Sequence, residues 1–450
     1  MTLLQSIIET VQLWSQQIEL YEKRHPDQCS LLANQEEAAH QLGLKLARLA
    51  LQALVEQSGK GYEGPYLPCS CQQGRLRYQR DSTRSLRTLA GLISYKRAYY
   101  YCRACGASRC PKDELLGQSH RDISAGVERL VALLSAHLSF ATSAKILAEV
   151  GRVSISGRQV ETVAESIGRQ AEALEQHNGE QSRFRQLPEI TGPKPEGYKA
   201  RVWVVEMDGV MVGLQSGEAS EVKVGIIYGL EQRAELSPGR WELLERQRCE
   251  VRGRVDEFRK RLWAMMLRVG VRQGDRIVVV ADGAEWIDQT LELLFYNATR
   301  VMDFYHTAQR VWAVGGVRFG EGSTKARRWA AEKLKALKAG EIQQVLAAMK
   351  RMKMDKQEAE EVRREAVRYL QNHRAGMKYD EYKSEGLPIG SGAIEGSCKH
   401  LVTARCKQAG MRWTEKGVDE ILALRCWVLN ERLDELQPKS KMAIEWRQAA

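Results

Sequence analysis

Residues 276–287, RIVVVADGAEWI, decide how the central part of this chain is interpreted. The apolar run is typical of a buried strand, and Asp282 and Gly283 follow it where the backbone is expected to turn. The stretch RVWVVEMDGV at 201–210 repeats the pattern, with Asp208 and Gly209 expected at the end of a second strand. SEVKVGIIYGL at 220–230 predicts a further strand between them. The two Asp-Gly pairs indicate either ordinary turns or carboxylates gathered at one edge of a sheet.

Length and composition indicate a folded protein with several domains. The chain has 450 residues, of which 43% are hydrophobic and 28% charged. No apolar run reaches about 18 residues, so we expect no transmembrane helix. The N-terminal stretch MTLLQSIIETVQLW predicts an amphipathic helix and not a signal peptide. We therefore expect a cytoplasmic protein whose ten cysteines are reduced.

The net charge of +11 is concentrated in two segments. Residues 72–112 hold ten Lys and Arg against the single acid Asp81, and residues 315–378 hold sixteen against eight acids. Two basic segments favour two contacts with a polyanion. For the second segment, solubilising helix faces are the alternative interpretation.

The order of the patterns predicts a multidomain α+β protein. We expect N-terminal helices over 1–60, a β-rich segment with cysteines over 61–118 and a helical region over 119–195. Within that region, SFATSAKILAEV and GRQVETVAESIGRQ predict a helix-turn-helix-like pair, although any other helical pair would give the same pattern. A Gly- and Pro-rich linker is expected at 187–200 and a loose tail at 438–450.

Four cysteines are spaced like the ligands of a zinc ribbon. Cys69 and Cys71 form a C-x-C pair, and Cys102 and Cys105 form a C-x-x-C pair about 30 residues later. Cys110 is an alternative ligand because the first pair is one residue shorter than usual. The competing interpretation is a group of reduced, buried thiols. The remaining cysteines are expected to be small core residues.

A third acid, Glu395, follows the Gly-rich turn in GSGAIEGSCKHLV at 390–402. Ile394, Cys398, Leu401 and Val402 have the spacing of one buried helix face. Two strand-end aspartates and a helix glutamate would suit two Mg²⁺ ions in phosphoryl transfer, because Mg²⁺ prefers oxygen ligands. The alternative is an exposed glutamate paired with Lys399 at i+4.

Asp303 and His306 lie together in VMDFYHTAQRV at 301–311, after another apolar run. A single histidine among aromatic residues is more often a packed core residue than a ligand.

Taken together, these motifs resemble those of Kra-type insertion-sequence transposases, which are relatives of the Mutator-like DDE enzymes. The resemblance covers about residues 60–430. It rests on PCSC, YYYCRACG, PKDELLG, EMDGVMV, EVKVGIIYG, ADGAEWI, MDFYHTAQ and, above all, GLPIGSGAIEGSCKHLVTARCKQAGMRW at 386–413. The sequence departs from the family at Cys69-Ser70-Cys71, where C-x-x-C is more usual.

The resemblance implies a ribonuclease-H-like catalytic domain in two parts, 196–312 and 386–437, separated by an all-helical basic insertion at 313–385. It implies that Asp208, Asp282 and Glu395 are a DDE triad that binds two Mg²⁺ or Mn²⁺ ions. The accessory pair Asp303 and His306 matches the Asp-x-x-His signature of the Mutator-like group. The basic residues Lys399, Arg405 and Lys407 are expected to contact DNA.

The partners implied are the terminal inverted repeats of a mobile element and its target DNA, bound by a homo-oligomer associated with the nucleoid and not with a membrane. Two other functions remain open. One is a DNA-binding protein derived from such an enzyme that has lost catalysis. The other is a ribonuclease-H-like nuclease that cleaves without joining. The intact Asp, Asp and Glu favour the active transposase.

Overall fold

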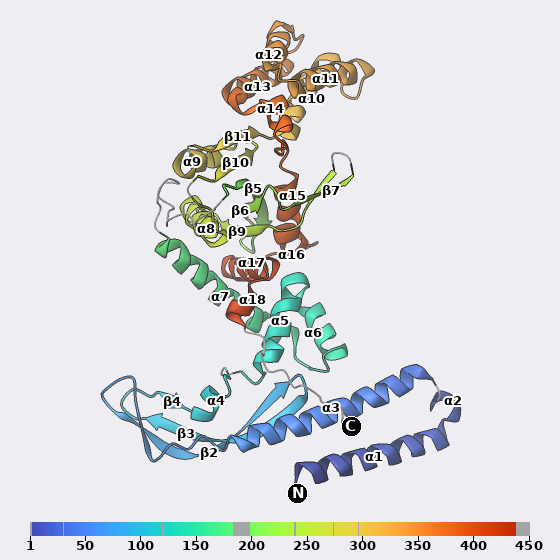
Figure 1. The fold of residues 1–450 in the computed structure, drawn as a ribbon, viewed down its shortest axis with the longest axis vertical. Coiled ribbons are helices and arrows are strands. Elements are labelled where there is room, and N and C mark those ends of the chain that lie inside the picture. Colours follow the sequence, from blue (N-terminus) through green and yellow to red (C-terminus); the bar gives the residue numbers. More distant parts are fainter. Residues whose placement is uncertain are drawn as a thin grey trace. The chain divides into compact units, whose positions relative to one another are not determined.

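The computed structural model describes residues 2–29, 31–118, 121–182, 199–237, 240–272, 274–295 and 297–437. The chain divides into two compact units, Met1–Ala164 and Glu165–Ala450, each built from both helices and strands (Figure 1). The expected multidomain α+β organisation is therefore confirmed. Most of the expected linker, 187–198, and the expected tail, 438–450, lie outside the described residues.

The first unit begins with helices and continues with a small sheet. Its elements are α1 (Leu3–Arg24), α2 (Pro26–Cys29), α3 (Leu32–Gln57), β1 (Tyr66–Pro68), β2 (Arg75–Thr88), β3 (Gly91–Cys102), β4 (Ser108–Arg109), α4 (Pro111–Leu115), α5 (Ala125–His137) and α6 (Phe140–Glu149). Helix α7 (Gly157–Gln181) runs across the boundary into the second unit.

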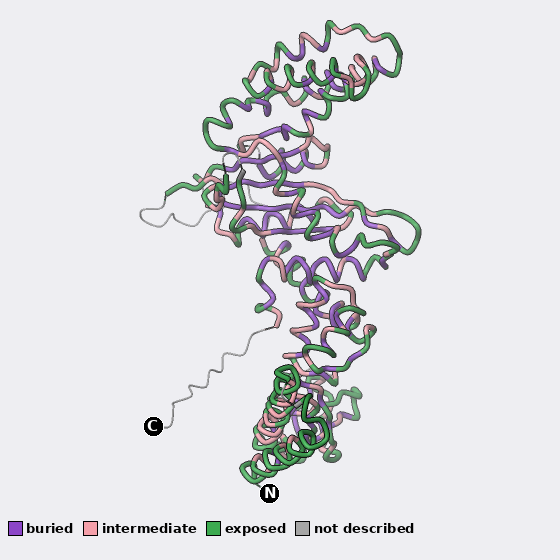
Figure 2. Tube along the Cα trace, turned by 90° about the vertical axis from the view of Figure 1, so that its right-hand side faces the viewer, coloured by how far each residue is buried: buried purple, intermediate pink, exposed green. Residues whose placement is uncertain are grey.

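Helices α1 and α3 pack along each other and remain largely exposed to solvent (Figure 2). Helix α1 starts at a capping box, in which Thr2 Oγ1 accepts from the Gln5 amide and Gln5 Oε1 accepts from the Thr2 amide. Trp14 Nε1 donates to the Ala38 carbonyl at 3.0 Å and ties the two helices together. The expected N-terminal helices are confirmed.

The β-rich segment is an antiparallel sheet in the order β1-β2-β3-β4. Its long β2–β3 hairpin is paired from Leu76 and Cys102 to Thr88 and Gly91. The apolar cluster of Val55, Leu86, Ile93 and Tyr95 attaches α3 to this hairpin. The strand expected from LISYKRAYYYC is confirmed as β3.

The helices after the sheet have clear starting signals. Ser124 Oγ accepts from the Val127 amide at the start of α5, and Ser139 Oγ accepts from the Thr142 amide at the start of α6. The order helix, loop, helix expected for 139–170 is confirmed by α6 and α7.

The second unit contains a five-stranded sheet and many helices. Its elements are β5 (Val202–Gly213), β6 (Ala219–Gly229), β7 (Arg233–Ser237), β8 (Arg240–Leu243), β9 (Gln247–Arg252), α8 (Val255–Val269), β10 (Arg276–Ala281), α9 (Glu285–Leu294), β11 (Thr299–Met302), α10 (Phe304–Phe319), α11 (Thr324–Lys338), α12 (Ile342–Arg351), α13 (Gln357–His373), η2 (Arg374–Gly376), α14 (Tyr379–Ser384), α15 (Gly392–Cys398), η3 (Lys399–Thr403), α16 (Ala404–Cys406), α17 (Glu415–Leu429) and α18 (Leu433–Leu436).

The strand order of the large sheet is β11-β10-β5-β6-β9. Strands β5, β6 and β9 are antiparallel neighbours, whereas β10 is parallel to both β5 and β11. All three expected strands are therefore present. One expectation was wrong, because Asp208 does not end a strand. Strand β5 continues to Gly213 since its second half is paired with β6.

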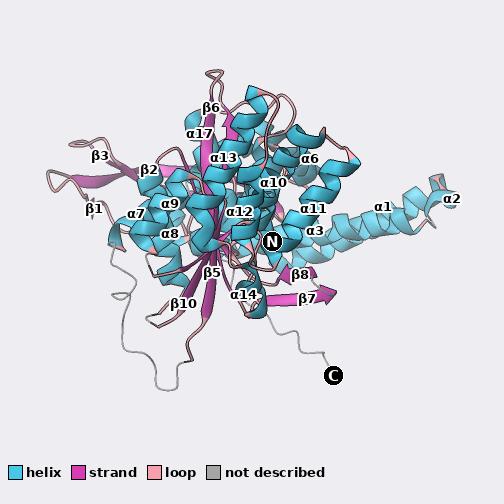
Figure 3. Ribbon diagram, turned by 90° about the horizontal axis from the view of Figure 1, so that it is seen from above, coloured by secondary structure: helices cyan, strands magenta, loops and turns pink. Residues whose placement is uncertain are grey.

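Helices cover both faces of this sheet (Figure 3). On one face, α8 and α9 bury a core against alternate residues of the strands, including Val205 and Met207 of β5 and Val279 of β10. On the other face, α15 packs on β5 and β6, and α17 packs on β9. Side chains at Glu206 and Asp208 alternate with the core residues and so point toward the α15 face.

The segment expected to be an all-helical insertion is helical, from α10 to α14, although α10 already begins at Phe304. Helix α10 packs against α11 and α13, which places α13 close to the loop after β10. Among the described residues, no helix is both long enough and apolar enough to cross a membrane.

Candidate functional site

The register of the sheet aligns Asp208 with Asp282. Strands β5 and β10 run parallel, and their last paired positions are Glu206 and Val280. Counting two residues further on both strands reaches Asp208 and Asp282. Residues two apart on a strand point to the same face, so Asp208 shares the face of Glu206. Asp282 is the first residue after β10, and its charge reaches Asp208.

Asp208 is half-buried, and its Oδ1 accepts from the Gly209 amide at 2.7 Å. Burial raises the pKa of Asp208, and the charge of Asp282 raises it further. The Gly209 amide, the charge of His306 and the Cys398 thiol lower it. A carboxylate whose ionised form is disfavoured by burial and by a neighbouring acid, as at Asp208, gains from a cation placed beside it.

Helix α13 supports the loop that carries Asp282. Asp282 Oδ1 accepts from the Ala284 amide at 2.9 Å, and the Tyr369 hydroxyl donates to the Asp282 carbonyl at 2.7 Å. Gly283 has a φ of +89°, and a Cβ at this position would lie 3.0 Å from the His373 ring. Both the backbone angle and the packing of α13 therefore favour glycine here.

Asp303 joins α10 to the Gly-rich turn before α15. It is fully buried and caps α10, where its Oδ1 accepts from the His306 amide at 2.6 Å and its Oδ2 accepts from the Ser391 amide at 2.5 Å. Burial alone would raise the pKa of Asp303, but the contacts with His306 and Ser391 outweigh it and lower the pKa. Asp303 therefore favours its ionised form, and both of its carboxylate oxygens accept hydrogen bonds from backbone amides.

His306 turns a partly exposed ring toward the acids. Its Nδ1 lies 3.2 Å from Asp303 Oδ1. This contact raises the pKa of His306, burial opposes the rise, and the charges of Asp303, Asp282 and Glu395 add to it. The imidazole therefore favours its cationic form beside the acidic residues.

Glu206 is a site residue that the sequence analysis missed. It has no exposed surface, and it accepts from the Tyr228 hydroxyl at 2.8 Å and from the Ile394 amide at 2.9 Å. Burial raises the pKa of Glu206 to about 7, although both hydrogen bonds lower it. Its only sequence signal is an acid inside an otherwise apolar strand, in WVVEM. Glu206 and Asp303 hold the chain at Ile394 and Ser391, immediately before Glu395.

Glu395 is exposed on α15, which packs across β5. Its charge raises the pKa of His306, and together with burial and the charge of Asp208 it raises the pKa of Cys398. Ile394, Cys398, Leu401 and Val402 are buried, as expected from their spacing. The α-helix ends at Cys398 and widens into a π-helical turn, whose His400 and Leu401 carbonyls accept from Arg425 Nε at 2.9 Å.

The charges of Asp282 and His306 reach Asp208, and those of Asp303, Asp282 and Glu395 reach His306, so these five residues lie near one another. In the part of the chain that is described, however, only the cysteines bring three or more potential metal-ligand atoms within 4.8 Å of one another. The three triad carboxylates do not form such a group.

The four expected cysteines do form a compact cluster. The sulfur atoms of Cys69, Cys71, Cys102 and Cys105 all lie within 4.8 Å of one another. Cys69 Sγ is 3.5 Å from Cys105 Sγ, and Cys71 Sγ is 3.9 Å from Cys102 Sγ. Cys110, the alternative ligand, is not part of the cluster. The C-x-C pair therefore reaches the same centre as the C-x-x-C pair.

Backbone amides point at the sulfur atoms of this cluster. The Gln73 amide and the neighbouring thiols lower the pKa of Cys71 to about 7. The turn that places the first pair has a Gln72 φ of +59°. A Cβ on Gly74 would lie 3.1 Å from Cys102 Sγ, so glycine leaves the sulfur room. Thiolates with this spacing and with amide donors can hold one metal ion such as zinc.

Comparison with protein families shows to which family the chain belongs. It matches, over residues 32–434, the model of a family described as Uncharacterised protein family (UPF0236). The chain belongs to the UPF0236 family. The matched range includes both the cysteine cluster and every acid of the candidate site. No curated protein matches the chain.

Three basic residues of this UPF0236 chain were expected to contact DNA, and they differ in exposure. Lys399 and Lys407 are exposed. Arg405 is only 1% exposed, and its guanidinium lies 5.0 Å from the centre of the Trp413 ring. The expectation for Arg405 was therefore wrong: this side chain packs inside the domain, where a phosphate cannot reach it.

Proposed function

We propose that this protein is a DDE transposase that binds the ends of an insertion sequence and catalyses metal-dependent DNA cleavage and strand transfer. The observation that carries the proposal is that β5, which holds Asp208, is paired in parallel with β10, which Asp282 directly follows, with Glu395 on the helix packed across β5. The charge of Asp282 reaches Asp208 although the two residues lie far apart in the sequence, which supports a shared role for the two acids.

The surrounding fold supports this proposal. Three antiparallel strands followed by two parallel ones, with helices on both faces, are compatible with the ribonuclease-H-like domain that the resemblance implies. The helices from α10 to α14 lie between the second aspartate and the glutamate, where the resemblance places an insertion. Contacts of α13 with the Asp282 loop give that insertion a role in shaping the site.

The acids would act by binding metal ions and by fixing the positions of those ions. Asp208, Asp282 and Glu395 would hold two Mg²⁺ or Mn²⁺ ions through their carboxylate oxygens. Such ions activate the attacking hydroxyl and stabilise the leaving oxygen of a phosphodiester. Asp303 and Glu206 would fix the chain that carries Glu395, because each accepts a backbone amide just before it. A cationic His306 would attract the scissile phosphate.

The cysteine cluster would hold a structural zinc ion. All four sulfur atoms point to one centre and leave no position for substrate, which is typical of folding sites. The ion would fix the end of the basic β2–β3 hairpin, which we propose binds DNA with the helices α5 to α7. Assembly on two element ends would bring together at least two copies of the chain.

The test is an assay of cleavage and joining. A plasmid carrying the element's ends would be incubated with Mg²⁺ and the wild-type chain, or with Asp208→Asn, Asp282→Asn or Glu395→Gln. Each amide preserves shape and removes charge, so cleavage and joining should fall by orders of magnitude while folding and DNA binding persist. Asp256→Asn, on an exposed face of α8, is the matched control and should retain activity.

The outcomes separate the alternatives. Cleavage without joining by the wild-type chain would identify a nuclease. DNA binding with no cleavage under any metal condition would identify a DNA-binding protein without catalysis. Full activity of any triad variant would remove that residue from the site.

A further inference from the structure

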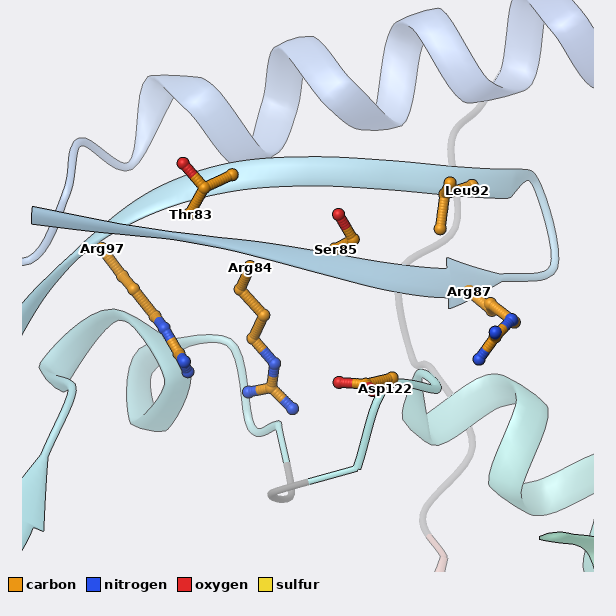
Figure 4. A pocket seen from close by; sticks show the side chains of 7 residues that line it. All are labelled: Thr83, Arg84, Ser85, Arg87, Leu92, Arg97 and Asp122. Carbon is orange, nitrogen blue, oxygen red and sulfur yellow. The ribbon is translucent and has the colours of Figure 1, made fainter.

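The β2–β3 hairpin carries a cavity lined by arginines. Its volume is about 480 Å³, and it is lined by Thr83, Arg84, Ser85, Arg87, Arg97 and Asp122, among others. Figure 4 shows the three arginine side chains extending from the hairpin toward the side on which Asp122 lies. The three guanidinium groups outnumber the carboxylate of Asp122 among the lining side chains, so hydrogen-bond donors predominate on this side of the hairpin.

Two of the arginines are held in place by one carboxylate. Asp113 lies 2.9 Å from Arg84 Nη1 and also pairs with Arg97. It accepts from the Tyr95 hydroxyl at 2.7 Å as well. One carboxylate therefore fixes two guanidinium groups and neutralises only one positive charge.

Arg87 differs from the other two arginines. No ion pair or side-chain hydrogen bond of Arg87 is found within the described part of the chain. Its backbone is nevertheless fixed, because its amide donates to the Asp122 carbonyl at 3.0 Å and its carbonyl accepts from the Ser124 amide at 2.9 Å. Asp122 is the one carboxylate among the lining side chains. The cavity thus keeps a net positive charge with one guanidinium available.

A second cavity of about 490 Å³ adjoins the first, since both are lined by Thr83. Its lining includes three lysines, Lys60, Lys96 and Lys112, and one acid, Glu56. Lys60 pairs with Asp81 at 2.9 Å, and Lys112 is buried over the Tyr95 ring, whereas Lys96 is exposed. The hairpin therefore presents two neighbouring basic cavities, one with arginines and one with lysines.

We propose that these two cavities bind neighbouring phosphates along a DNA backbone, with Arg87 and Lys96 as the principal contacts. This inference rests on the proposed function and specifies which surface of the protein contacts DNA. Arginine forks suit the paired oxygens of a phosphate, and lysine acts as a point charge. Two sites in a row suit a polymer with regularly repeated phosphates better than a single free anion. Contacts of this kind position DNA without reading its sequence.

The test is the salt dependence of DNA binding by the full-length chain. Fluorescence anisotropy would follow a labelled duplex of random sequence and one that carries an element end, over a series of salt concentrations. Each lost phosphate contact should reduce the slope of log K against log salt by about 0.9. We expect this reduction for Arg87→Ala and for Lys96→Ala, and about twice as much for the double variant. Both duplexes should weaken equally.

Three controls make the result specific. Arg87→Lys keeps the charge and should keep most of the slope. Lys45→Ala removes an exposed charge from α3 and should leave the slope unchanged. Asp256→Asn, on an exposed face of α8 and outside the candidate site, should also bind DNA with the wild-type slope.

Different results would contradict this inference and the proposed function. If the wild-type chain binds DNA and Arg87→Ala and Lys96→Ala keep its slope, the inference is wrong while the proposed function stands. If inorganic pyrophosphate binds the wild type, fails to bind Arg87→Ala and the DNA slope does not change, the cavity takes a free phosphate. Absence of any DNA binding by the wild type would overturn both proposals.

Discussion

Asp208 lies within β5, two residues beyond Glu206, and Asp282 begins the loop after β10, two residues beyond Val280, the residue paired with Glu206. This alignment depends on β10 adding to β5 in parallel, and parallel pairing requires the long connection through β6, β9 and α8. The two acids are therefore neighbours only in the folded chain. Their mutual repulsion is a cost that a bound cation would remove.

The cysteine cluster should hold one zinc ion per chain. Replacing Cys102 and Cys105 by Ser should abolish zinc binding and unfold the end of the β2–β3 hairpin, because four thiolates with no open position serve folding. Elemental analysis of the purified protein would measure the zinc content. Cys110→Ser is the matched control, and it should keep the zinc since this thiol lies outside the cluster. Zinc loss in Cys110→Ser alone would show that the ligand set is wrong.

Glu206 should matter for stability as well as for catalysis. Glu206→Ala leaves the Tyr228 hydroxyl and the Ile394 amide without their acceptor, at a cost of about 1–3 kcal/mol for each unsatisfied group. Glu206→Gln keeps an acceptor oxygen and should lose less. Urea unfolding would give the free energies, and hydrogen exchange at the Ile394 amide would report the anchor directly. Unchanged exchange in Glu206→Ala would contradict this role.

The protonation state of the His306 imidazole should depend on Asp303. Asp303 raises the pKa of His306 above its ordinary 6.5, so the imidazole should stay cationic to a higher pH than a free histidine. This stabilising contact is fully present below pH 6.5 and is lost as the pH rises through the raised pKa. An NMR titration of the His306 ring should show the raised value in the wild type and a lower one in Asp303→Asn. An identical pKa in both proteins would remove Asp303 as the cause.

Gly283 should resist substitution more strongly than a glycine with a similar backbone angle. Gly283→Ala and Gly217→Ala both force alanine to a φ near +90°, which costs about 1 kcal/mol. Only at Gly283 would the new Cβ also press on the His373 ring, at 3.0 Å, whereas nothing lies within 4 Å at Gly217. Gly283→Ala should therefore be the less stable variant in urea and should lose DNA cleavage, while Gly217→Ala retains it. Equal losses in both would show that α13 does not support the Asp282 loop.

Local patterns were sufficient for much of the fold. The apolar run at 276–280 predicted β10, and the spacing of Ile394, Cys398, Leu401 and Val402 predicted the buried face around α15. The cysteine spacing predicted the cluster, even with a short first pair. Each of these features depends mainly on residues close together in the sequence.

Features that depend on distant partners were missed. Strand β5 continues past Asp208 because β6 pairs with it as far as Gly213. The sequence of β5 alone does not show where this pairing ends. Arg405 looks like a surface cation, yet Trp413 covers it in the folded domain. Glu206 could be interpreted only once its acceptor role for the Ile394 amide, far along the chain, was known.

The location of a bound divalent ion tests the central claim most directly. Crystals of the full-length protein with element-end DNA and Mn²⁺ would give anomalous scattering that marks each ion. We predict a manganese peak bridging the carboxylates of Asp208 and Asp282, and its loss in Asp208→Asn crystals grown in the same way. A chain that binds end DNA in the crystal with no manganese between these two residues would contradict the claim.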